Sequence, residues 1–599
     1  MRVHQPGGSL TRARTAEVAD WSWRSTRRRL GTLWRLTRPY RGRAGLSVFS
    51  LLAATATALA PPYLAKYALD DALRGNDGDR LTLVVVVFLA AGLANWGMTY
   101  VETYLTGWVG ERILADLRAQ LFGHLQRLSL GFYERNRAGV IISRLTNDVE
   151  AIDQLVTDGV TTLVQSTLLL VGTAVLLFVL DWRLALATLA VIPLMSAATV
   201  LFRTRSSRAY AAVRERLGLV TATLAEDIAG MRTVQAFNRE DAAARNFREV
   251  TLRYRESNMQ TVLLNGLYFP FVDLLSSIAL AVVLGYGGRL YFEHAITLGT
   301  LFAFMLYVGN FFDPVQQLSQ LYNTFLSATA ALDKILGVLD EQPQIVDRAG
   351  ARPLPQIEGR LSFESVRFAY GRGEEVLHGI DLDVPAGTTV ALVGHTGAGK
   401  STIAKLLARF YEPTHGRITI DGHDLNDVTQ ESLRRQLGVV PQEGFLFAGT
   451  VAENIAFGRP DARPEEIVRA AQTVGAHEFV LRLEDGYATQ LGERGSRLSL
   501  GQRQLVAFAR ALLADPRILI LDEATSSVDI GTERTIERAL RTLLADRTAF
   551  IIAHRLSTIR DADLIVVLEH GRVVEQGSHA ELLATRGLYT SLYGDWAAA

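Results

Sequence analysis

The chain has 599 residues, which is longer than a single domain usually is, so we expect two or more domains. Its 62 basic and 62 acidic residues balance to a net charge of zero, and we expect no nucleic-acid partner. The sequence contains no cysteine, which excludes disulfides and metal sites built from thiolates. Long charge-free apolar segments in the first half exclude a purely soluble enzyme.

The N-terminal region, residues 1–43, is strongly basic, with eleven arginines against two acidic residues. We expect no signal peptide, because the arginine-rich stretch runs too long before the first apolar segment and no cleavage site follows. Aromatic residues accompany the arginines, which suits a short interfacial helix ahead of the membrane. They are Trp21, Trp23, Trp34 and Tyr40.

Six apolar segments follow, each about as long as the ~20 residues that a membrane-spanning helix needs. Only the fifth contains a charged residue, Asp273. We therefore expect residues 44–335 to form a six-helix membrane domain. The segments are 44–65, 81–101, 160–180, 184–202, 257–288 and 295–312.

An even number of spans puts both ends of this domain on one side of the membrane. The arginines ahead of the first span place that side in the cytoplasm, because basic residues concentrate there. We expect a multi-pass protein of the cytoplasmic membrane, with both termini and the domain after the last span in the cytoplasm. The arginines are Arg24, Arg27, Arg28, Arg29, Arg35, Arg38, Arg41 and Arg43.

The connections between the spans differ in length. The outer ones are short, whereas the two inward ones, residues 102–159 and 203–256, exceed fifty residues and are rich in helix formers. A helix that continues ~20 residues beyond the bilayer projects ~30 Å, far enough to reach a cytoplasmic domain. Each inward connection has a turn-like break, at 131–139 and 230–237, where a transverse helix fits. Plain solvated helical loops are the alternative.

A proline-rich polar stretch ends at Glu358, and we expect residues 336–358 to form a linker. Residues 359–599 alternate short β-branched strands with helical stretches, which predicts an α/β nucleotide-binding domain with a phosphate-binding loop. That loop is the run Gly394-His395-Thr396-Gly397-Ala398-Gly399-Lys400-Ser401.

This run matches the phosphate-loop pattern between a strand and a helix. Its glycines let backbone N–H groups turn inward around phosphates, at a helix N-terminus that already favours anions. Lys400 would reach the β- and γ-phosphates, and the Ser401 hydroxyl would bind Mg²⁺. Lysine is rare in this chain, so a chance match to the pattern is uncommon, and a glycine-rich turn is the alternative.

Further polar residues stand where strands of this domain are expected to end. Asp522 would hold Mg²⁺ through water, and Glu523 would polarise the attacking water. His554 follows a second apolar run and suits a contact with the γ-phosphate. Gln442 follows a third and would bond Mg²⁺ or the water, while Tyr370 offers a flat face for adenine. An exposed acidic turn, a structural histidine and a surface aromatic are the alternatives.

In chain order, these motifs resemble those of ATP-binding-cassette (ABC) transporters. The segment Leu498-Ser499-Leu500-Gly501-Gln502 is similar to the family signature, and Ser526-Ser527-Val528-Asp529 to the motif that follows it. Residues 489–495 are similar to a loop specific to exporters. With six spans before one nucleotide domain, the chain resembles half-transporters of the exporter type (type IV fold), including bacterial multidrug and lipid A exporters.

The resemblance implies ATP and Mg²⁺ as cofactors and a second half-transporter chain as partner. Each ATP would lie between the phosphate loop of one chain and the signature of the other, where Ser499 and Gly501 contact its γ-phosphate. The family pattern adds Thr402, Gln502 and Asp529 to the ATP-binding set. ATP binding and hydrolysis would then turn a membrane cavity alternately inward and outward.

Leu500 departs from the family signature, which usually has glycine there. A side chain at this position hinders close approach of the backbone to phosphate. In heterodimeric members, an intact catalytic glutamate often coexists in one chain with an altered signature. We therefore favour a heterodimer, and a homodimer that tolerates the substitution is the alternative.

The membrane domain gives weaker indications of a substrate. A carboxylate inside a span is costly, so Asp273 is predicted to line the pathway and to favour cationic or polar groups. The alternative is a hydrogen bond to Asn265 or to a neighbouring span. Asn310 is a second candidate for the pathway.

The expected function is ATP-driven export of an amphipathic small molecule, lipid or peptide across the membrane. Import of metal chelates by the same fold is an alternative that an extra substrate-reducing domain would support. An ATP-gated regulator is another, which the presence of Glu523 disfavours.

Overall fold

The computed structural model describes residues 31, 35, 37–371, 373–442, 444–522, 530–553 and 555–598. Contacts within it divide the chain into two compact units. The first contains the described residues up to Gln126 together with Ala138–Glu341. The second contains Arg127–Arg137 and the described residues from Gln342 onward, so a short piece of the first inward connection belongs with the nucleotide domain.

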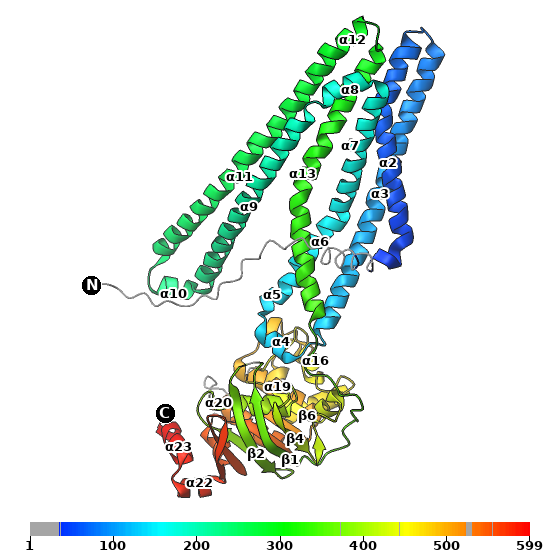
Figure 1. Ribbon diagram of the computed structural model, residues 1–599. Helices are drawn as coiled ribbons and strands as arrows, with labels where there is room; N and C mark the ends of the chain where they lie inside the picture. The colour runs from blue at the N-terminus through cyan, green and yellow to red at the C-terminus, as the bar shows by residue number, and fades with distance from the viewer. Residues whose placement is uncertain are drawn as a thin grey trace, which may run out of the picture. The chain divides into compact units, whose positions relative to one another are not determined.

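In its described residues the first unit is helical, and six of its helices are long and apolar enough to cross a membrane. The predicted number of spans is confirmed. Figure 1 shows the long pair α9 and α11 side by side, joined by α10. The six candidate spans are Arg38–Leu73, Gly78–Leu125, Ala138–Leu180, Trp182–Ala229, Glu240–Phe292 and Leu298–Leu321.

Several of these spans are assembled from consecutive helical pieces. The α-helices of this unit are α2 (Arg41–Tyr67), α3 (Gly78–Leu125), α5 (Ala138–Ser143), α6 (Val149–Gln154), α7 (Val160–Leu180), α8 (Trp182–Leu189), α9 (Ile192–Ala229), α10 (Met231–Ala236), α11 (Glu240–Val282), α12 (Gly288–Phe292) and α13 (Leu298–Asp340). Short 3₁₀ or π-helical turns adjoin them at η1 (Arg38–Tyr40), η2 (Ala68–Leu73), η3 (Arg144–Asp148), η4 (Leu155–Gly159) and η5 (Val283–Gly287).

Polar caps begin the helices that follow the short outer connections. The side chains of Asp77, Asp181 and Thr297 accept hydrogen bonds from backbone N–H groups in the first turns of α3, α8 and α13. Such caps satisfy N–H groups that a helix start leaves without a partner. Asp181 also follows the last residue of α7, so a single residue turns the chain between the third and fourth spans.

The fourth predicted segment, residues 184–202, is not one continuous helix. It is divided between α8 and α9 at Ala190 and Val191. Pro193 stands in the first turn of α9, where its missing N–H costs little, whereas a continuous helix would lose a hydrogen bond at this point.

The two inward connections form helical arms, each with a short helix at its predicted break. α4 (Leu130–Arg135) lies in the first connection and α10 in the second. Beyond the fourth span, α9 continues to Ala229, and α11 leads back from Glu240. The expectation of long helices interrupted by a short one is confirmed in both connections.

The second unit, apart from α4, is an α/β domain with two sheets. A four-stranded antiparallel sheet has the order β2-β1-β4-β5, and a six-stranded sheet has the order β10-β9-β3-β8-β7-β6. Within the larger sheet, β9, β3, β8, β7 and β6 pair in parallel, so their carboxyl ends meet at one edge. β10 pairs antiparallel with β9.

The strands are β1 (Leu361–Ala369), β2 (Glu375–Val384), β3 (Thr389–Val393), β4 (His415–Ile420), β5 (His423–Asp424), β6 (Leu437–Val440), β7 (Ile518–Asp522), β8 (Thr548–Ile552), β9 (Leu564–Glu569) and β10 (Arg572–Gly577). The α-helices are α14 (Lys400–Leu407), α15 (Gln430–Arg434), α16 (Val451–Ala456), α17 (Pro464–Thr473), α18 (His477–Leu481), α19 (Leu500–Ala514), α20 (Ile530–Leu544), α21 (Leu556–Arg560), α22 (His579–Thr585) and α23 (Leu588–Ala598). Two 3₁₀ turns, η6 (Gly486–Ala488) and η7 (Glu493–Gly495), precede α19.

Helix α14 lies in the apolar core between the two sheets. Ile403, Leu406 and Leu407 are buried in one cluster with residues of β1, β2, β3 and β8. A second cluster on the other side of the larger sheet contains residues of α16, α17, α19 and α20. This arrangement holds α14 firmly at the edge where the parallel strands end.

An ion-paired carboxylate joins the end of the first span to the start of the last span. Asp70 accepts hydrogen bonds from the Thr297 hydroxyl (2.5 Å) and the Gly299 N–H (2.9 Å), and Lys66 Nζ lies 3.3 Å from it. The carboxylate therefore sits at the N-terminus of α13, where the helix dipole favours negative charge. A Cβ atom on Gly299 would overlap the Lys66 carbonyl oxygen and the Asp70 carboxylate.

Because of this contact, we expect alanine substitutions at two glycines of α13 to change the free energy of unfolding by different amounts. Gly299→Ala should lower the free energy of unfolding by roughly 1–3 kcal/mol, because the added methyl displaces the Asp70 contact. Gly309→Ala is the control, since a Cβ there meets nothing within 4 Å, and alanine favours a helix by about 1 kcal/mol. Thermal unfolding of both variants in the same detergent measures the difference, and equal melting temperatures would show that the outer contact contributes nothing.

Candidate nucleotide site

The phosphate loop connects β3 to α14 in the order that the sequence predicts. Gly394 and Gly399 adopt φ values of +145° and +104°, which side chains rarely adopt. A Cβ on Gly394 would overlap the Leu568 carbonyl oxygen, and a Cβ on Gly399 would lie 2.7 Å from Leu377 Cδ2. Both positions therefore require glycine, for conformation and for space.

The Lys400 side chain extends back over the phosphate loop. Its ammonium group donates hydrogen bonds to the carbonyl oxygens of Gly394 (2.7 Å) and His395 (3.0 Å), and the residue is buried. Burial lowers the pKa of Lys400, and the nearby charge of Asp522 partly opposes that effect. A buried ammonium held by neutral carbonyls would gain from exchanging them for charged phosphate oxygens.

The remaining loop residues divide by exposure. His395, Thr396, Gly397 and Ser401 are exposed and open to a ligand, whereas Ala398 and Thr402 are buried and hold the loop to the domain. The Ala398 carbonyl accepts a hydrogen bond from the Gly571 N–H at 3.2 Å, which ties the loop to the turn after β9.

The sheet brings the predicted strand-end residues to the same edge as the loop. Asp522 ends β7 opposite Ile552 of β8, and β8 pairs with β3. Gln442 follows β6 and is exposed. Glu523, Asp529 and His554 lie outside the described residues, so their roles stay predictions.

Tyr370 lies beside the phosphate-loop helix. Its hydroxyl is 3.1 Å from the Thr402 hydroxyl, and the Lys405 ammonium lies 5.6 Å from the centre of its ring. The ring also packs edge-on against Phe368 and Tyr411. An adenine stacked on Tyr370 would therefore lie at the same helix that carries Lys400.

The signature segment forms the start of α19. Ser499 is the N-cap, its Oγ accepts from the Gln502 N–H (3.3 Å), and the Gln502 side chain accepts from the Ser499 N–H (3.0 Å). Ser499 is exposed, Leu500 is half-buried at the first helical position and Gly501 is buried. The geometry therefore presents a helix N-terminus with an exposed hydroxyl, an arrangement that suits an anion.

Glu134 in α4 is a contact residue that the sequence did not reveal. Its carboxylate accepts hydrogen bonds from the Lys405 ammonium (2.7 Å) and the Tyr411 hydroxyl (2.6 Å). Burial alone would raise the pKa of Glu134, but these two hydrogen bonds outweigh it and leave the pKa below its ordinary value. Lys405 therefore contacts both the Glu134 carboxylate and the face of the Tyr370 ring, so that a single side chain links Glu134 to Tyr370. A lone acidic residue in a predicted break carries no signal for such a partner.

The predicted pathway residues lie in the first unit. Asp273 is exposed, and its Oδ1 accepts a hydrogen bond from Gln316 Nε2 of α13 at 3.0 Å. Asn265, which the sequence also offered as a partner, donates to the Tyr210 hydroxyl instead. Asn310 is half-buried in α13. The hydrogen bond to a neighbouring span is present, and the role of Asp273 in a pathway stays a prediction.

Glu102 is a buried carboxyl that sequence reasoning assigned to the inward connection. It is 6% exposed within α3, and the hydroxyls of Thr103, Thr106 and Thr161 donate to it at 3.2, 3.0 and 3.3 Å. Because Glu102 directly follows the charge-free segment 81–101, the sequence places it just outside the predicted span and does not indicate that it is buried. The hydroxyl cluster joins α3 to α7.

Comparison with known proteins shows the family of this chain. Residues 44–315 match the family model of the ABC transporter transmembrane region, and residues 377–526 match the family model named ABC transporter. The chain therefore belongs to the ABC transporters. It is a multi-pass membrane protein with an ATPase domain that is coupled to transport.

Individual relatives narrow this class to exporters. The chain is 42% identical to an uncharacterised ABC transporter ATP-binding protein of Bacillus subtilis, YknV, over 94% of each protein. It is 38% identical to the ATP-dependent lipid A-core flippase of Syntrophus aciditrophicus, over 94% of this chain and 93% of the flippase. It is also 40% identical to a multidrug efflux ATP-binding/permease protein of Mycobacterium tuberculosis, over 94% of this chain but 47% of that protein.

The structure of a bacterial Atm1-family ABC exporter with ATP bound matches with a TM-score of 0.78 and 32% identity, over 93% of this chain and 99% of that one. The half-transporter organisation and the type IV exporter fold are therefore confirmed. The comparisons favour an exporter over the importer and regulator alternatives.

The Glu134 contact predicts a pH-dependent contribution to stability. Because its pKa is lowered in the folded chain, the stabilisation is present above the ordinary range of a glutamate and is lost as the pH falls through the lowered pKa. Glu134→Gln should cost at most about 1 kcal/mol near pH 7, since both partners are partly exposed. The difference in melting temperature from the unmodified chain should shrink below pH ~4. A difference that stays constant with pH would show that charge plays no part.

Proposed function

We propose that this chain is one half of an ATP-driven exporter that moves an amphipathic small molecule, lipid or peptide across the cytoplasmic membrane by alternating access. The observation that carries the proposal is the combination, in one chain, of six candidate spans with a phosphate loop whose lysine is poised over neutral carbonyls. The arginines ahead of the first span support a cytoplasmic location for the nucleotide domain and both termini.

The residues at the site fit ATP with Mg²⁺. Mg²⁺ prefers oxygen ligands, and Ser401, Gln442 and Asp522 supply hydroxyl, amide and carboxylate oxygens at one edge of the sheet. Bound there, Mg²⁺ would neutralise charge on the β- and γ-phosphates. Lys400 and the loop N–H groups would hold the phosphates, and Tyr370 would stack on adenine.

The catalytic roles follow from the same edge. Glu523 would orient and polarise water at the γ-phosphate, with His554 and Gln442 beside it. Asp529 would stand with Ser499, Gly501 and Gln502 in the surface that meets the ATP of a partner chain. Because Ser499, the N-cap of α19, is exposed, its hydroxyl is accessible to such a partner.

Exposed apolar residues on the second inward arm support a partner chain. Leu224, Ile228 and Phe237 are 44%, 62% and 72% exposed, and they lie beyond the fourth predicted span. On the proposed topology lipid does not reach them, so a second half-transporter chain is the cover that we propose. Leu500 favours a different chain rather than a second copy, because heterodimeric members of the family often combine an altered signature with an intact catalytic glutamate in one chain.

Hydrolysis by the chain purified alone tests both the activity and the partner. In lipid nanodiscs, a heterodimer predicts little ATPase from this chain by itself, whereas a homodimer predicts robust, cooperative ATPase. Glu523→Gln should lower any such activity about a hundredfold or more, because it removes the general base. ATPase that survives Glu523→Gln would contradict the assignment of Glu523.

Transport of a cationic amphiphile tests the role proposed for Asp273. Asp273→Asn should reduce ATP-driven uptake of rhodamine 6G into inside-out vesicles roughly tenfold, which corresponds to about 1.4 kcal/mol of lost charge interaction. Ser277→Ala, one turn away in α11, is the matched control, because its hydroxyl donates to the Asp273 backbone carbonyl and not to the carboxylate. Unchanged transport by Asp273→Asn across a panel of cations would remove Asp273 from the pathway.

A further inference from the structure

An arginine occupies the position just past α14 where glycine is usual. Arg409 has φ +48°, a left-handed conformation that residues with a side chain adopt at an energetic cost. The Arg409 N–H bonds the Leu406 carbonyl and the Phe410 N–H bonds the Lys405 carbonyl, both at 2.9 Å, which is the Schellman pattern of a helix end. A strained backbone at this point implies that the arginine side chain does something that glycine would not.

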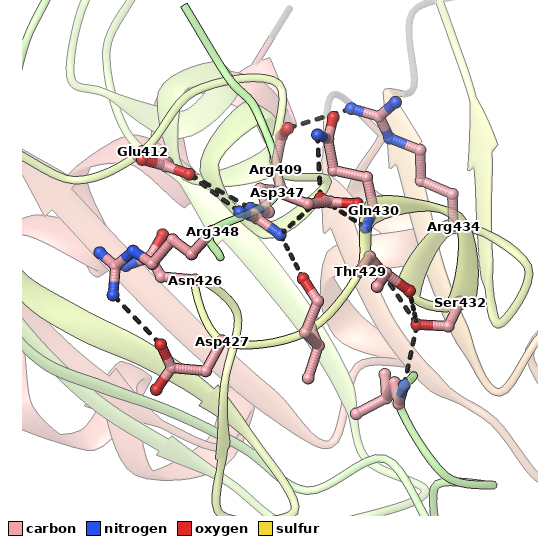
Figure 2. A network of polar contacts seen from close by, with 12 residues as sticks. Asp347, Arg348, Arg409, Glu412, Asn426, Asp427, Thr429, Gln430, Ser432 and Arg434 are labelled. Atoms are coloured by element: carbon pink, nitrogen blue, oxygen red, sulfur yellow. Dashed lines mark hydrogen bonds and ion pairs between the residues drawn. The ribbon is translucent and has the colours of Figure 1, made fainter. Parts of the chain in front are cut away.

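The Arg409 guanidinium is buried, 1% exposed, and makes contacts on three sides (Figure 2). Nη1 donates to the Val428 carbonyl at 2.6 Å, and Nε and Nη2 donate to Glu412 Oε1 at 3.3 and 3.1 Å. Nη1 also lies 3.6 Å from Asp347 Oδ1. Arginine suits this role because its planar group holds several acceptors at fixed angles.

Asp347 is held in place from the opposite side. The same Oδ1 accepts hydrogen bonds from the Gln430 N–H (3.0 Å) and its side-chain amide (3.1 Å). Arg434 donates to the Arg409 carbonyl at 3.2 Å, and its guanidinium lies 5.4 Å from the centre of the Phe410 ring. The segment that carries Asp347 is therefore fixed to the end of α14 by a charge-balanced network around the buried Arg409 guanidinium, with Asp347 on its exposed side.

Asp347 belongs to the chain segment that leaves the last membrane helix. α13 ends at Asp340, and the nucleotide unit begins at Gln342. In the same segment, the Ile345 N–H donates to Ser129 Oγ at 2.9 Å, just before α4. Both pieces of chain that lead to membrane helices are thus attached around residues 405–412, next to α14.

We propose that Arg409 and Asp347 are positioning residues that join the segment after α13 to the phosphate-loop helix, so that α13 and Lys400 move together. α14 has eight residues and spans about 12 Å, and its buried face makes it a rigid rod with Lys400 at one end and the Arg409 contact beyond the other. This inference rests on the proposed function, and it adds a path from ATP to the last span.

Two neighbouring residues in the segment allow a matched test. Asp347→Asn removes the charge that faces Arg409 but keeps an oxygen for Gln430. Arg348→Gln is the control, because Arg348 pairs with Asp427 at 3.1 Å on the surface and both residues are more than half exposed. Both variants are made in the full chain, in the complex that hydrolyses ATP.

Because the sequence contains no cysteine, introduced cysteines can carry spin labels at chosen positions, and the distance between two labels measures the movement. Asp79→Cys and Phe292→Cys place spin labels at exposed positions at the start of α3 and the end of α12. The change in label distance on trapping with ATP and vanadate reports motion of the spans. We expect Asp347→Asn to reduce that change at least twofold while its maximal ATPase rate stays within about twofold of the parent. Arg348→Gln should match the parent in both measurements.

Equal distance changes in the two variants would overturn the proposal. A tenfold loss of ATPase in Asp347→Asn would also overturn it, because the contact would then support hydrolysis itself rather than its link to α13. Arg409→Gly keeps a favourable residue for the helix end and deletes the side chain, so it should reproduce the reduced movement. A parent complex that hydrolyses no ATP, or shows no distance change, would instead contradict the proposed function on which the inference rests.

Discussion

The burial of α14 between two sheets is the constraint on which the nucleotide unit depends. Ile403 and Leu407 are completely buried, and close packing means that the helix cannot tilt without disturbing strands on both sides. The phosphate loop inherits this fixed position at the helix start, where Gly394 and Gly399 allow the backbone to pass close to neighbouring strands. Preorganisation of this kind reduces the cost of binding phosphate, because the loop need not be ordered by the ligand.

The membrane unit depends on a different constraint. In hydrocarbon every backbone polar group needs an internal partner, so the spans are helices and their ends carry the polar chemistry. Asp70, Asp181 and Thr297 each satisfy backbone N–H groups at the start of a helix. Glu102 is likewise satisfied by internal hydrogen bonds, since hydroxyls on its own helix and on α7 donate to its buried carboxyl group.

Local patterns predicted much of this structure. Spans are visible in sequence because their apolarity is continuous, and the phosphate loop is visible because its function requires an unbroken run of residues. The α/β order of the second domain followed from alternating segments. The break between α8 and α9 was not predicted, because the apolar run continues through Pro193 and conceals it.

Contacts between distant segments could not be predicted in this way. Glu134 and Lys405 are 271 positions apart, and nothing in either neighbourhood indicates the other. Nothing in the sequence around Arg409 distinguishes it from other basic residues, and its importance follows only from a positive φ and from burial. Such residues can be recognised only from the folded structure, which shows where charged side chains are buried and which distant groups they contact.

The residues around Asp273 offset only part of the energetic cost of placing a carboxylate inside a span. A carboxylate near the middle of a span costs about 2.5–3.5 kcal/mol on insertion scales, and the amide of Gln316 supplies a hydrogen bond without a compensating charge. A neutral donor stabilises the carboxylate less than a cation does, so water or a positively charged group beside Asp273 would lower the remaining cost of its charged form. The side chain is exposed rather than packed in the helical core, which leaves room for either. A water-filled pathway that receives a cationic group would meet both requirements at one position, and this is why the carboxylate carries more weight for substrate class than the uncharged Asn310.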